Sequence, residues 1–536
     1  MNKTNIYTSI TFAPVQGFIE KSRKLRDLYG ASLILSYLSQ RLVKEFHKPP
    51  ELEVISPASH NLQKGMPNRI LIKGEVSKGD AEIILLSAWK NILQVCRTWV
   101  ERKLPDYEYH WEREWTLWGS HTWEVFQGSG HSIKAAMDDL ETRKLSRAWS
   151  AVNWIGESSS LTGTDAIAFP GLGAQTRNPK NMNYHSENDS IKGFYTQLAR
   201  KLDNCPPEKE PEGKYIAPNE KLSIPELVKR LITLPEIADL ISETRPDNQP
   251  LEKLKRFQEI ERKPQPNKKK PGQWTGWFMG DGDKVGDHLK KIADENHSDR
   301  KIETFSEAMR KWGEEFEQNF PEDLGRVVYA GGDDFLGIIY SKNPAEPIQP
   351  LTAYQWLRAL NDKWQEHQQP ITVSVGFVWV AGSVPQRDVL QHCREAEKLA
   401  KSSGRNRVTI RVVFNSGQYV QWTCPWDYLD ILTKYRDRER KSNWSHVYQD
   451  LAHLESRRTF KIENAREAYI VKKSAIEFFE LYFPGEGQKL LDDKDDKLAK
   501  HLAGFSDNDD AIDRAKAIID WMTDLIQVGW HLCSNT

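Results

Sequence analysis

Two adjacent aspartates, Asp333 and Asp334, stand between two apolar, strand-like stretches of the segment RVVYAGGDDFLGIIYS (326–341). The preceding glycines, Gly331 and Gly332, permit a tight hairpin turn with positive φ, which would place both carboxylates at its tip. Neighbouring carboxylates repel each other and lose water on burial, so at least one pKa would rise unless a cation neutralises them. Gly-Asp is also ordinary hairpin chemistry, so this motif alone leaves a purely structural role open.

A second acidic motif ends the strand-like segment WTGWFMGDGD (274–283). If this segment is the strand beside the hairpin, Asp281 faces Asp333 and Asp334 at short distance. Three carboxylates with open coordination positions suit Mg²⁺ or Mn²⁺, which also bind substrate phosphates. A pair of such ions can activate an attacking hydroxyl and stabilise the leaving pyrophosphate in nucleotidyl transfer. We expect Asp283 on the other face of the strand, which makes it a weaker candidate ligand.

Basic side chains that could bind phosphate occur in AKSSGRNR (400–407), at the end of a predicted helix. Lys401 and Arg405 are four residues apart, so both could reach a triphosphate from one side if the helical turn persists. Lysine supplies a point charge, and arginine supplies a two-pronged donor. The alternative is a basic helix C-terminus, which the helix dipole favours without any ligand.

These residues lie in a block whose hydrophobic pattern predicts the order βαββαβ, as in a ferredoxin-like palm. Its predicted strands and helices cover 274–283, 284–319, 326–341 (a hairpin), 353–367, 371–380, 386–402 and 407–414. The beginning of the chain opens in a similar way, with predicted strands at 5–13 and 69–75 and predicted helices at 15–44 and 80–103. After about residue 420 the strand patterns stop, and the remainder reads as helical.

The fold class predicted is therefore α/β plus α, in four domains. Residues 1–150 are expected to form a palm-like α/β domain without catalytic acids, and 151–270 a loop-rich and helical linker domain. Residues 271–420 form the α/β domain with the GGDD hairpin, and 421–536 form an all-helical domain. The linker domain ends in KPQPNKKKPGQ (263–273), whose prolines and lysines are typical of an exposed linker.

Composition excludes several classes of protein. The 536 residues carry 75 Lys+Arg and 76 Asp+Glu, and the resulting net charge of −1 excludes a globally basic nucleic-acid binder. The five cysteines form no C-x-x-C pair, so we expect neither zinc nor a disulfide framework. The sequence has no apolar run of about 18 residues and no signal-peptide block at its start. We therefore expect a cytoplasmic protein without membrane contact.

Taken together, the acidic and basic motifs resemble the palm of diguanylate cyclases (the GGDEF family) and of nucleotide cyclases. The resemblance rests on GDGD (280–283), YAGGDDF (329–335), TVSVGF (372–377) and AKSSGRNR (400–407). The second acid after the glycines is Asp334 instead of glutamate, which is the form found in the large subunits of type III CRISPR effector complexes. The segment FAPVQGFIEKSRKLRDLYGASLILSYL (12–38) is similar to the opening palm of the type III-B large subunit.

The resemblance implies two ferredoxin-like, cyclase-type palms in one chain, with catalytic acids only in the second. It implies an enzyme that joins ATP into cyclic oligoadenylate and releases pyrophosphate when the complex captures target RNA. The other type III-B subunits and the guide RNA would be its further partners. The implied metal ligands, for Mg²⁺ or Mn²⁺, are Asp281, Asp333 and Asp334. The implied nucleotide contacts are Lys401 and Arg405 at the triphosphate, with Gly282, Asp283, Gly331 and Gly332 lining the site.

Two departures from that family qualify the expectation. Many relatives begin with an HD nuclease domain, but here the palm pattern starts almost at residue 1 and none of the 14 histidines is followed by aspartate. We therefore expect no metal-dependent DNA cleavage by this chain. Relatives also often carry paired zinc-binding cysteines, where this sequence has serines in ESSSLTG (157–163). We expect that segment to fold without metal.

Two other functions stay open from the sequence. One is a structural scaffold of the same complex, whose acids are little used and whose Arg23, Lys24 and Arg26 hold subunits or guide RNA. The other is a free-standing nucleotide cyclase, although such an enzyme needs neither the N-terminal block nor the long helical tail.

Overall fold

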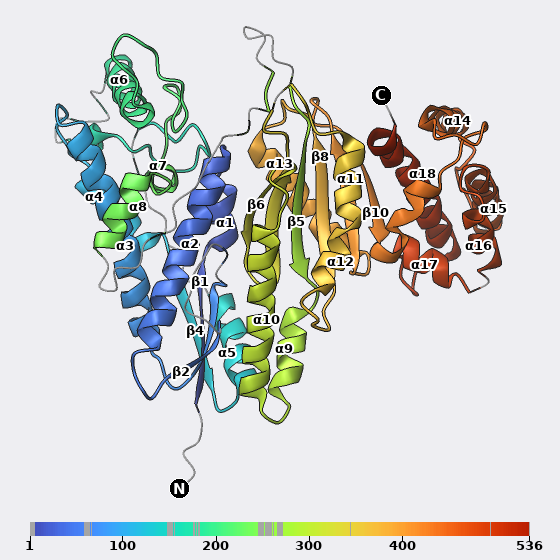
Figure 1. The fold of residues 1–536 in the computed structure, drawn as a ribbon, viewed down its shortest axis with the longest axis horizontal. Coiled ribbons are helices and arrows are strands. Elements are labelled where there is room, and N and C mark those ends of the chain that lie inside the picture. Colours follow the sequence, from blue (N-terminus) through green and yellow to red (C-terminus); the bar gives the residue numbers. More distant parts are fainter. Residues whose placement is uncertain are drawn as a thin grey trace. The chain divides into compact units, whose positions relative to one another are not determined.

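The computed structural model describes residues 6–57, 65, 67–146, 154, 156–174, 177, 180, 183–244, 251, 260, 262–264, 272–343, 345–493 and 495–534. The chain divides into two compact units (Figure 1). Unit 1 comprises Met1–Ile260 and Gly286–Glu314, and unit 2 comprises Glu261–Val285 and Glu315–Thr536. Most of the predicted linker segment, residues 265–271, lies outside the described residues.

Unit 1 contains a four-stranded antiparallel sheet in the order β2-β3-β1-β4. With α2 between β1 and β2 and α3 between β3 and β4, this order is the ferredoxin-like split βαβ arrangement. Apolar residues pair across the strands, as with Ile10 and Ile70, which are both fully buried. The elements are β1 (Tyr7–Ala13), α1 (Val15–Glu20), α2 (Leu25–Phe46), β2 (Glu53–Ser56), β3 (Arg69–Lys73), α3 (Lys78–Lys103), α4 (Glu112–His121), β4 (Glu124–Gly130) and α5 (Ile133–Leu145).

The sequence predicted part of this sheet. The expected strands at 5–13 and 69–75 and the expected helix at 80–103 are confirmed by β1, β3 and α3. The expected helix at 15–44 is instead two helices, because residues 21–24 interrupt it. The strands β2 and β4 were not predicted, since β2 has only four residues and β4 ends in Gln-Gly-Ser-Gly.

Unit 1 also includes most of α9 (Val285–Ala293) and most of α10 (Ser298–Gln318), which follow β5 in the sequence. The Asp299 carboxylate accepts a hydrogen bond from the Tyr7 hydroxyl at 3.1 Å and is 2.7 Å from the Lys73 ammonium. Ile292 and Ile302 pack in one cluster with residues of β1, β2, β3 and α5. These two helices therefore help to bury one face of the first sheet.

The part of unit 1 that follows α5 packs on α2 and α3 through two short helices, α7 (Ile224–Leu231) and α8 (Pro235–Glu243). It also contains the longer helix α6 (Tyr184–Asp203) and a 3₁₀ turn η1 (Pro170–Gly173). In the serine segment 157–163, the Ser159 hydroxyl donates to Glu226 at 2.5 Å. Glu226 also accepts from the Ser223 backbone N–H, so one carboxylate joins this segment to the start of α7.

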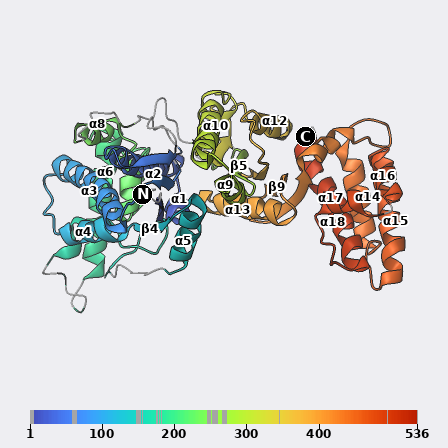
Figure 2. The same ribbon diagram turned by 90° about the horizontal axis from the view of Figure 1, so that it is seen from below.

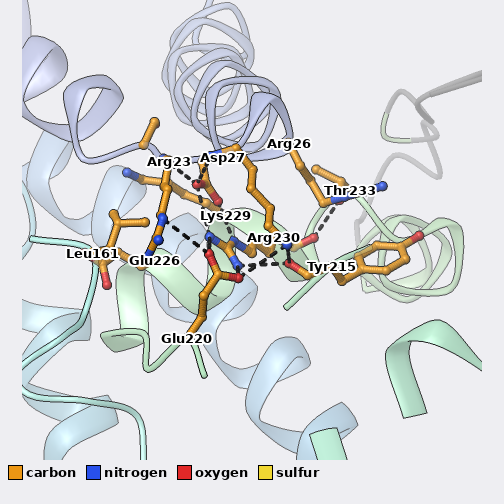
Figure 3. A network of polar contacts seen from close by, with 12 residues as sticks. Arg23, Arg26, Asp27, Leu161, Tyr215, Glu220, Glu226, Lys229, Arg230 and Thr233 are labelled. Atoms are coloured by element: carbon orange, nitrogen blue, oxygen red, sulfur yellow. Dashed lines mark hydrogen bonds and ion pairs between the residues drawn. The ribbon is translucent and has the colours of Figure 1, made fainter. Parts of the chain in front are cut away.

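A buried ionic network joins α2 to α7 (Figure 3). The fully buried Arg230 guanidinium lies 2.7 Å from both the Asp27 and the Glu220 carboxylates. Lys24 lies 3.3 Å from Glu220 and also donates to the Gly213 carbonyl. The carboxylates and cations thus neutralise one another where water is excluded. Removal of any one of them would leave a buried charge without its counter-ion.

The contacts of this network contradict part of the scaffold alternative, in which the basic residues of 23–26 hold subunits or guide RNA. Arg26 is only 6% exposed, donates to the Thr233 hydroxyl and stacks over the Tyr215 ring. Lys24 is directed into the protein, and Arg23 precedes the helix instead of sharing a face of α2 with Arg26. Arg26 and Lys24 therefore make contacts within the protein, and the expectation that they hold RNA or a subunit is wrong.

Glu220 makes the stability of unit 1 depend on pH. Burial alone would raise its pKa, but Arg230 and Lys24 outweigh burial and lower the pKa of Glu220 from 4.5 to about 2. The ionised carboxylate thus contributes about 3 kcal/mol above pH 4.5, and this contribution is lost as the pH falls through the range between 4.5 and 2. We expect the stability difference between the wild type and Glu220→Gln to fall by about half from pH 6 to pH 3.

Hydrogen exchange of the α7 amides, compared between the two proteins at each pH, measures this difference. The exposed Glu208 offers a matched control, and Glu208→Gln should show no such pH dependence. A difference between wild type and Glu220→Gln that stays constant over this range would contradict the ionic role.

Unit 2 is built on a six-stranded sheet in the order β10-β9-β8-β5-β7-β6. Four adjacent strands of this sheet, β8-β5-β7-β6, repeat the ferredoxin-like connectivity of the first sheet, and β9 adds in parallel to β8 after α13. The expected order βαββαβ and the expectation of two palm-type folds are confirmed. The elements are β5 (Thr275–Gly282), β6 (Gly325–Ala330), β7 (Asp334–Ile339), α11 (Pro350–Arg358), α12 (Leu360–Gln365), β8 (Val373–Val380), α13 (Gln386–Ser402), β9 (Arg407–Val413) and β10 (Tyr419–Pro425).

The strand β10 lies across residue 420, where the sequence predicted that strands end. It pairs with β9 in antiparallel register and is followed by the 3₁₀ segment η3 (Trp426–Lys434). The remaining helices, which Figure 2 shows gathered together, are α14 (Trp444–Ser456), α15 (Ala465–Tyr482), α16 (Glu486–Asp492), α17 (Lys497–Ala503) and α18 (Ala511–Cys533). In the part of the chain that the structure describes, no helix combines the length and apolarity needed to cross a membrane.

Candidate active site

The GGDD motif forms the turn between β6 and β7. The Gly331 backbone N–H donates to the Asp334 carbonyl at 2.8 Å and closes the turn. Gly332 has φ +100°, a conformation that side chains other than glycine rarely adopt. The Gly282 N–H donates to the Asp333 carbonyl at 2.7 Å and thereby ties the turn to the end of β5. The predicted hairpin turn with positive φ is confirmed at Gly332. The backbone hydrogen bonds fix the positions of the main chain at Asp333 and Asp334.

Strand β5 brings the third aspartate to this turn. In the antiparallel pairing of β5 with β7, Asp281 lies directly opposite Asp334. On its other side β5 pairs with β8, where Asp281 lies opposite Ser374. Directly opposed residues in antiparallel strands have Cα atoms about 4.5–5.5 Å apart. The expected adjacency of Asp281 to the hairpin is therefore confirmed by the strand register.

Burial and mutual repulsion raise the pKa values of Asp281 and Asp334. The Asp334 side chain reaches solvent, but the protein around it removes much of its water. This loss of water, followed by repulsion from Asp333 and Asp281, raises the pKa of Asp334 well above its ordinary value. Burial also raises the pKa of Asp281, although Lys401 opposes that shift. The cluster therefore holds negative charge that a nearby cation would stabilise.

Lys401 supplies a cation to this cluster from the last turn of α13. Its ammonium pairs with the Asp281 carboxylate and with Glu397, whose Oε1 lies 2.6 Å away. Glu397 is one helical turn earlier on α13. Burial raises the pKa of Glu397, and its pairing with Lys401 opposes the shift. Glu397 was not among the residues predicted from the sequence, although its spacing of four residues from Lys401 permits such a pair on a helix.

Helix α13 approaches the sheet closely because β8 contains Gly376. A Cβ atom at this position would lie 2.2 Å from the Cys393 carbonyl oxygen and 2.5 Å from the Glu397 backbone nitrogen. Any larger residue would push the helix away from the sheet. Gly376 therefore positions the part of α13 that carries Glu397 and Lys401.

Arg405 does not share a helix face with Lys401, contrary to the expectation. The helix ends at Ser402, and Gly404, Arg405 and Asn406 all have positive φ. Arg405 is exposed in this loop, and its carbonyl accepts a hydrogen bond from the Arg407 guanidinium at 3.0 Å. Lys401 therefore belongs to the last turn of α13, and Arg405 belongs to the loop that follows it.

Asp283 has a structural role in this arrangement. Its carboxylate accepts hydrogen bonds from the Thr372 hydroxyl at 2.8 Å, the Ser374 hydroxyl at 2.7 Å and the Asn406 backbone N–H at 2.9 Å. The expectation that Asp283 lies on the other strand face from Asp281 is wrong, because Asp283 follows the end of β5 and its carboxylate bonds to Ser374, the residue of β8 that lies directly opposite Asp281. Asp283 thus fastens the loop before β9 to β8.

Removing the Asp283 carboxylate should loosen that loop. In Asp283→Ala, three buried or half-buried donors lose their acceptor, which costs about 2–4 kcal/mol locally. We expect hydrogen exchange in the segment 400–408 to become at least about 10-fold faster. Asp323→Ala, at an exposed position of unit 2, is the matched control and should leave that exchange unchanged. Unchanged exchange in Asp283→Ala would contradict the fastening role.

The site contains the donors that a divalent cation requires, but they are not gathered into a formed metal site. Among the described residues no group of three or more His, Cys, Asp and Glu side chains is arranged to hold a metal ion. The Asp281 carboxylate is instead paired with Lys401. Three aspartates that converge on one strand end do match the oxygen-donor chemistry of Mg²⁺. The raised pKa values of Asp281 and Asp334 reflect crowded carboxylates, whose negative charge a bound cation would stabilise.

Comparisons with known proteins match both palm-type regions. The N-terminal domain of the CRISPR-associated protein Cmr2 matches residues 7–78, and the second palm domain of Cas10/Cmr2 matches residues 275–409. No curated protein matches the chain at a significant level. The second match contains all the predicted site residues, from Asp281 to Arg405.

Solved structures include similar folds. The Type III-B Cmr-beta complex in its apo state contains a chain with a TM-score of 0.51 and 11% identity, covering 98% of this chain and 82% of that one. The Csm1-Csm4 subcomplex of the type III-A CRISPR-Csm interference complex gives a TM-score of 0.46 at 13% identity, covering 99% and 70%. The Csm1-Csm4 cassette in complex with cA4 gives 0.43 at 14%, covering 99% and 70%.

The two family matches fall on the two sheets of the structure, and both describe domains of the same protein family. The Cmr-beta likeness extends this agreement in fold over nearly the whole chain. The chain therefore contains two regions that match domains of the Cas10/Cmr2 family, one at residues 7–78 and one at residues 275–409.

Proposed function

We propose that this chain is the large subunit of a type III-B effector complex and that its second palm joins ATP into cyclic oligoadenylate, with release of pyrophosphate. The observation that carries the proposal is the pairing of Asp281 with Asp334 at the end of β5, beside the turn that holds Asp333. This acidic cluster lies within the region that matches the second palm of the family. Guide RNA, target RNA and the other subunits are the proposed partners.

The three aspartates would hold Mg²⁺ or Mn²⁺ at this strand end. Bound there, the cation would act as a Lewis acid on the phosphate oxygens. The residues of the chain bind and orient the nucleotide: Lys401 is within reach of a phosphate near Asp281, and the exposed Arg405 offers a guanidinium from the adjacent loop. The attacking 3′-hydroxyl belongs to a second ATP, so the reaction needs no nucleophile from the protein.

The backbone around the aspartates keeps them in register. The Gly331 N–H donates a hydrogen bond within the hairpin, and the Gly282 N–H donates one from β5 to the hairpin. Asp283 fixes the loop that carries Arg405. These contacts give Gly282, Asp283 and Gly331 a part in shaping the nucleotide site. We propose that these residues and Gly332 also contact the nucleotide directly.

The experiment is incubation of the assembled complex with labelled ATP, Mg²⁺ and target RNA. We expect oligoadenylate that lacks a terminal phosphate, as a ring must, together with one pyrophosphate for each linkage formed. Omission of target RNA is the matched control. An assembled complex that captures target RNA but forms no such product with Mg²⁺ or Mn²⁺ would favour the scaffold function instead.

A further inference from the structure

Lys401 is held between two carboxylates, and one of them belongs to the proposed cation site. Its ammonium pairs with Asp281 and, at 2.6 Å, with Glu397. A divalent cation on Asp281 would meet the positive charge of Lys401 at close range, where like charges repel strongly. A cation can therefore bind Asp281 well only when the ammonium moves away from that carboxylate.

Glu397 is placed to receive the ammonium when it moves. Its side chain is only 12% exposed, and its backbone is fixed against Gly376 of β8. Because Glu397 and Lys401 are one turn apart on α13, their ion pair survives a small displacement of the lysine away from Asp281. The buried carboxylate thus keeps a partner in both arrangements, and Lys401 stays beside the site.

We propose that Glu397 is a positioning residue that holds Lys401 beside Asp281, and that displacement of Lys401 couples the binding of the divalent cation to the binding of the nucleotide. The inference rests on the proposed function, since it requires the cation site at Asp281. A triphosphate gives Lys401 a new anionic partner and so frees Asp281 for the cation. By linkage, the cation also favours the arrangement in which Lys401 is available to the triphosphate.

The test measures binding of Mn²⁺ alone to the full chain, from the electron paramagnetic resonance signal of the free ion. Lys401→Gln removes the competing ammonium, and we expect it to bind Mn²⁺ about fivefold more tightly than the wild type, or more. Structural damage would not increase the affinity. Lys398→Gln, at an exposed position of the same helix, is the matched control and should behave as the wild type.

A second variant tests Glu397 itself. Glu397→Gln removes one of the two carboxylates that pair with Lys401 and leaves Asp281 as the other. We therefore expect this variant to bind Mn²⁺ more weakly than the wild type. Glu397→Asp keeps a carboxylate and should retain most of the affinity. The loss should shrink when Lys401→Gln is also present, because the effect acts through the lysine. An equal loss in both backgrounds would overturn the role of Glu397.

The outcomes separate this inference from the proposed function. Mn²⁺ binding that persists in Asp333→Ala plus Asp334→Ala would overturn the cation site and the inference with it. If that variant loses Mn²⁺ binding but Lys401→Gln binds Mn²⁺ no more tightly than the wild type, the coupling alone is overturned. If neither the wild type nor Lys401→Gln binds Mn²⁺, both proposals fail.

Discussion

Replacing Asp333 and Asp334 together by alanine is expected to lower oligoadenylate formation by at least about 10³-fold. The two carboxylates stand at the turn that faces Asp281, and without them the proposed cations lose most of their protein ligands. Loss of that electrostatic stabilisation corresponds to about 4 kcal/mol of transition-state free energy. The measurement is the initial rate of pyrophosphate release from ATP by the assembled complex with target RNA.

The matched control is the double variant Asp323→Ala plus Asp362→Ala, which removes two exposed carboxylates from unit 2. It should retain the wild-type rate. Binding of target RNA, measured in parallel, shows whether the complex of each variant is intact. A product that forms at the wild-type rate in Asp333→Ala plus Asp334→Ala would remove these residues from the site.

Replacing Arg230 by methionine is expected to destabilise unit 1 by about 3–5 kcal/mol. Arg230 is fully buried and lies 2.7 Å from two carboxylates that are themselves nearly inaccessible to water. Methionine of similar length would leave Asp27 and Glu220 together without their main counter-ion. The measurement is hydrogen exchange of the α2 and α7 amides, which should accelerate by at least about 100-fold.

Arg113→Met provides the comparison, because Arg113 is exposed on α4 and pairs with the neighbouring Glu114 at the surface. Its effect should stay within about 0.5 kcal/mol. If Arg230→Met exchanged no faster than Arg113→Met, the network of Figure 3 would not hold α7 to α2.

The second palm could be predicted in some detail because its pattern is local. Apolar strands such as β5 and β8 are buried along their length, and each is bounded by acidic or turn residues that mark its end. The Gly-Gly pair before Asp333 indicated the hairpin, and the βαββ order then placed β5 beside β7. The adjacency of Asp281 and Asp334 followed from that order alone.

Contacts between distant side chains could not be predicted in this way. The pairing of Lys401 with Asp281 depends on how closely α13 approaches β8, which Gly376 sets through three-dimensional packing. The separation of Arg405 from Lys401 depends on positive φ angles in the loop, which the sequence Ser-Gly-Arg-Asn permits without requiring. The strand β10 was missed because Tyr419–Pro425 gains its pairing from β9 and carries few strongly apolar residues.

In the first palm, the basic residues of 23–26 led to a wrong prediction of an RNA or subunit contact. Lys24 and Arg26 look like a basic surface in the sequence, but their partners Glu220 and Thr233 are about 200 residues away. Only the packing of the segment around α7 against α2 shows that these cations are internal. A short run of basic residues is therefore weak evidence for a nucleic-acid contact when its acidic partners lie elsewhere in the chain.

The most direct test of the cation site is a diffraction experiment on the protein with Mn²⁺ and a non-hydrolysable ATP analogue, using the anomalous signal of manganese. We predict a manganese peak at coordination distance, about 2–2.5 Å, from carboxylate oxygens of Asp281 and of the Asp333–Asp334 turn, with Lys401 moved from Asp281 toward the phosphates. A bound nucleotide whose manganese lies away from these carboxylates, or a Lys401 that still pairs with Asp281 beside it, would contradict the account.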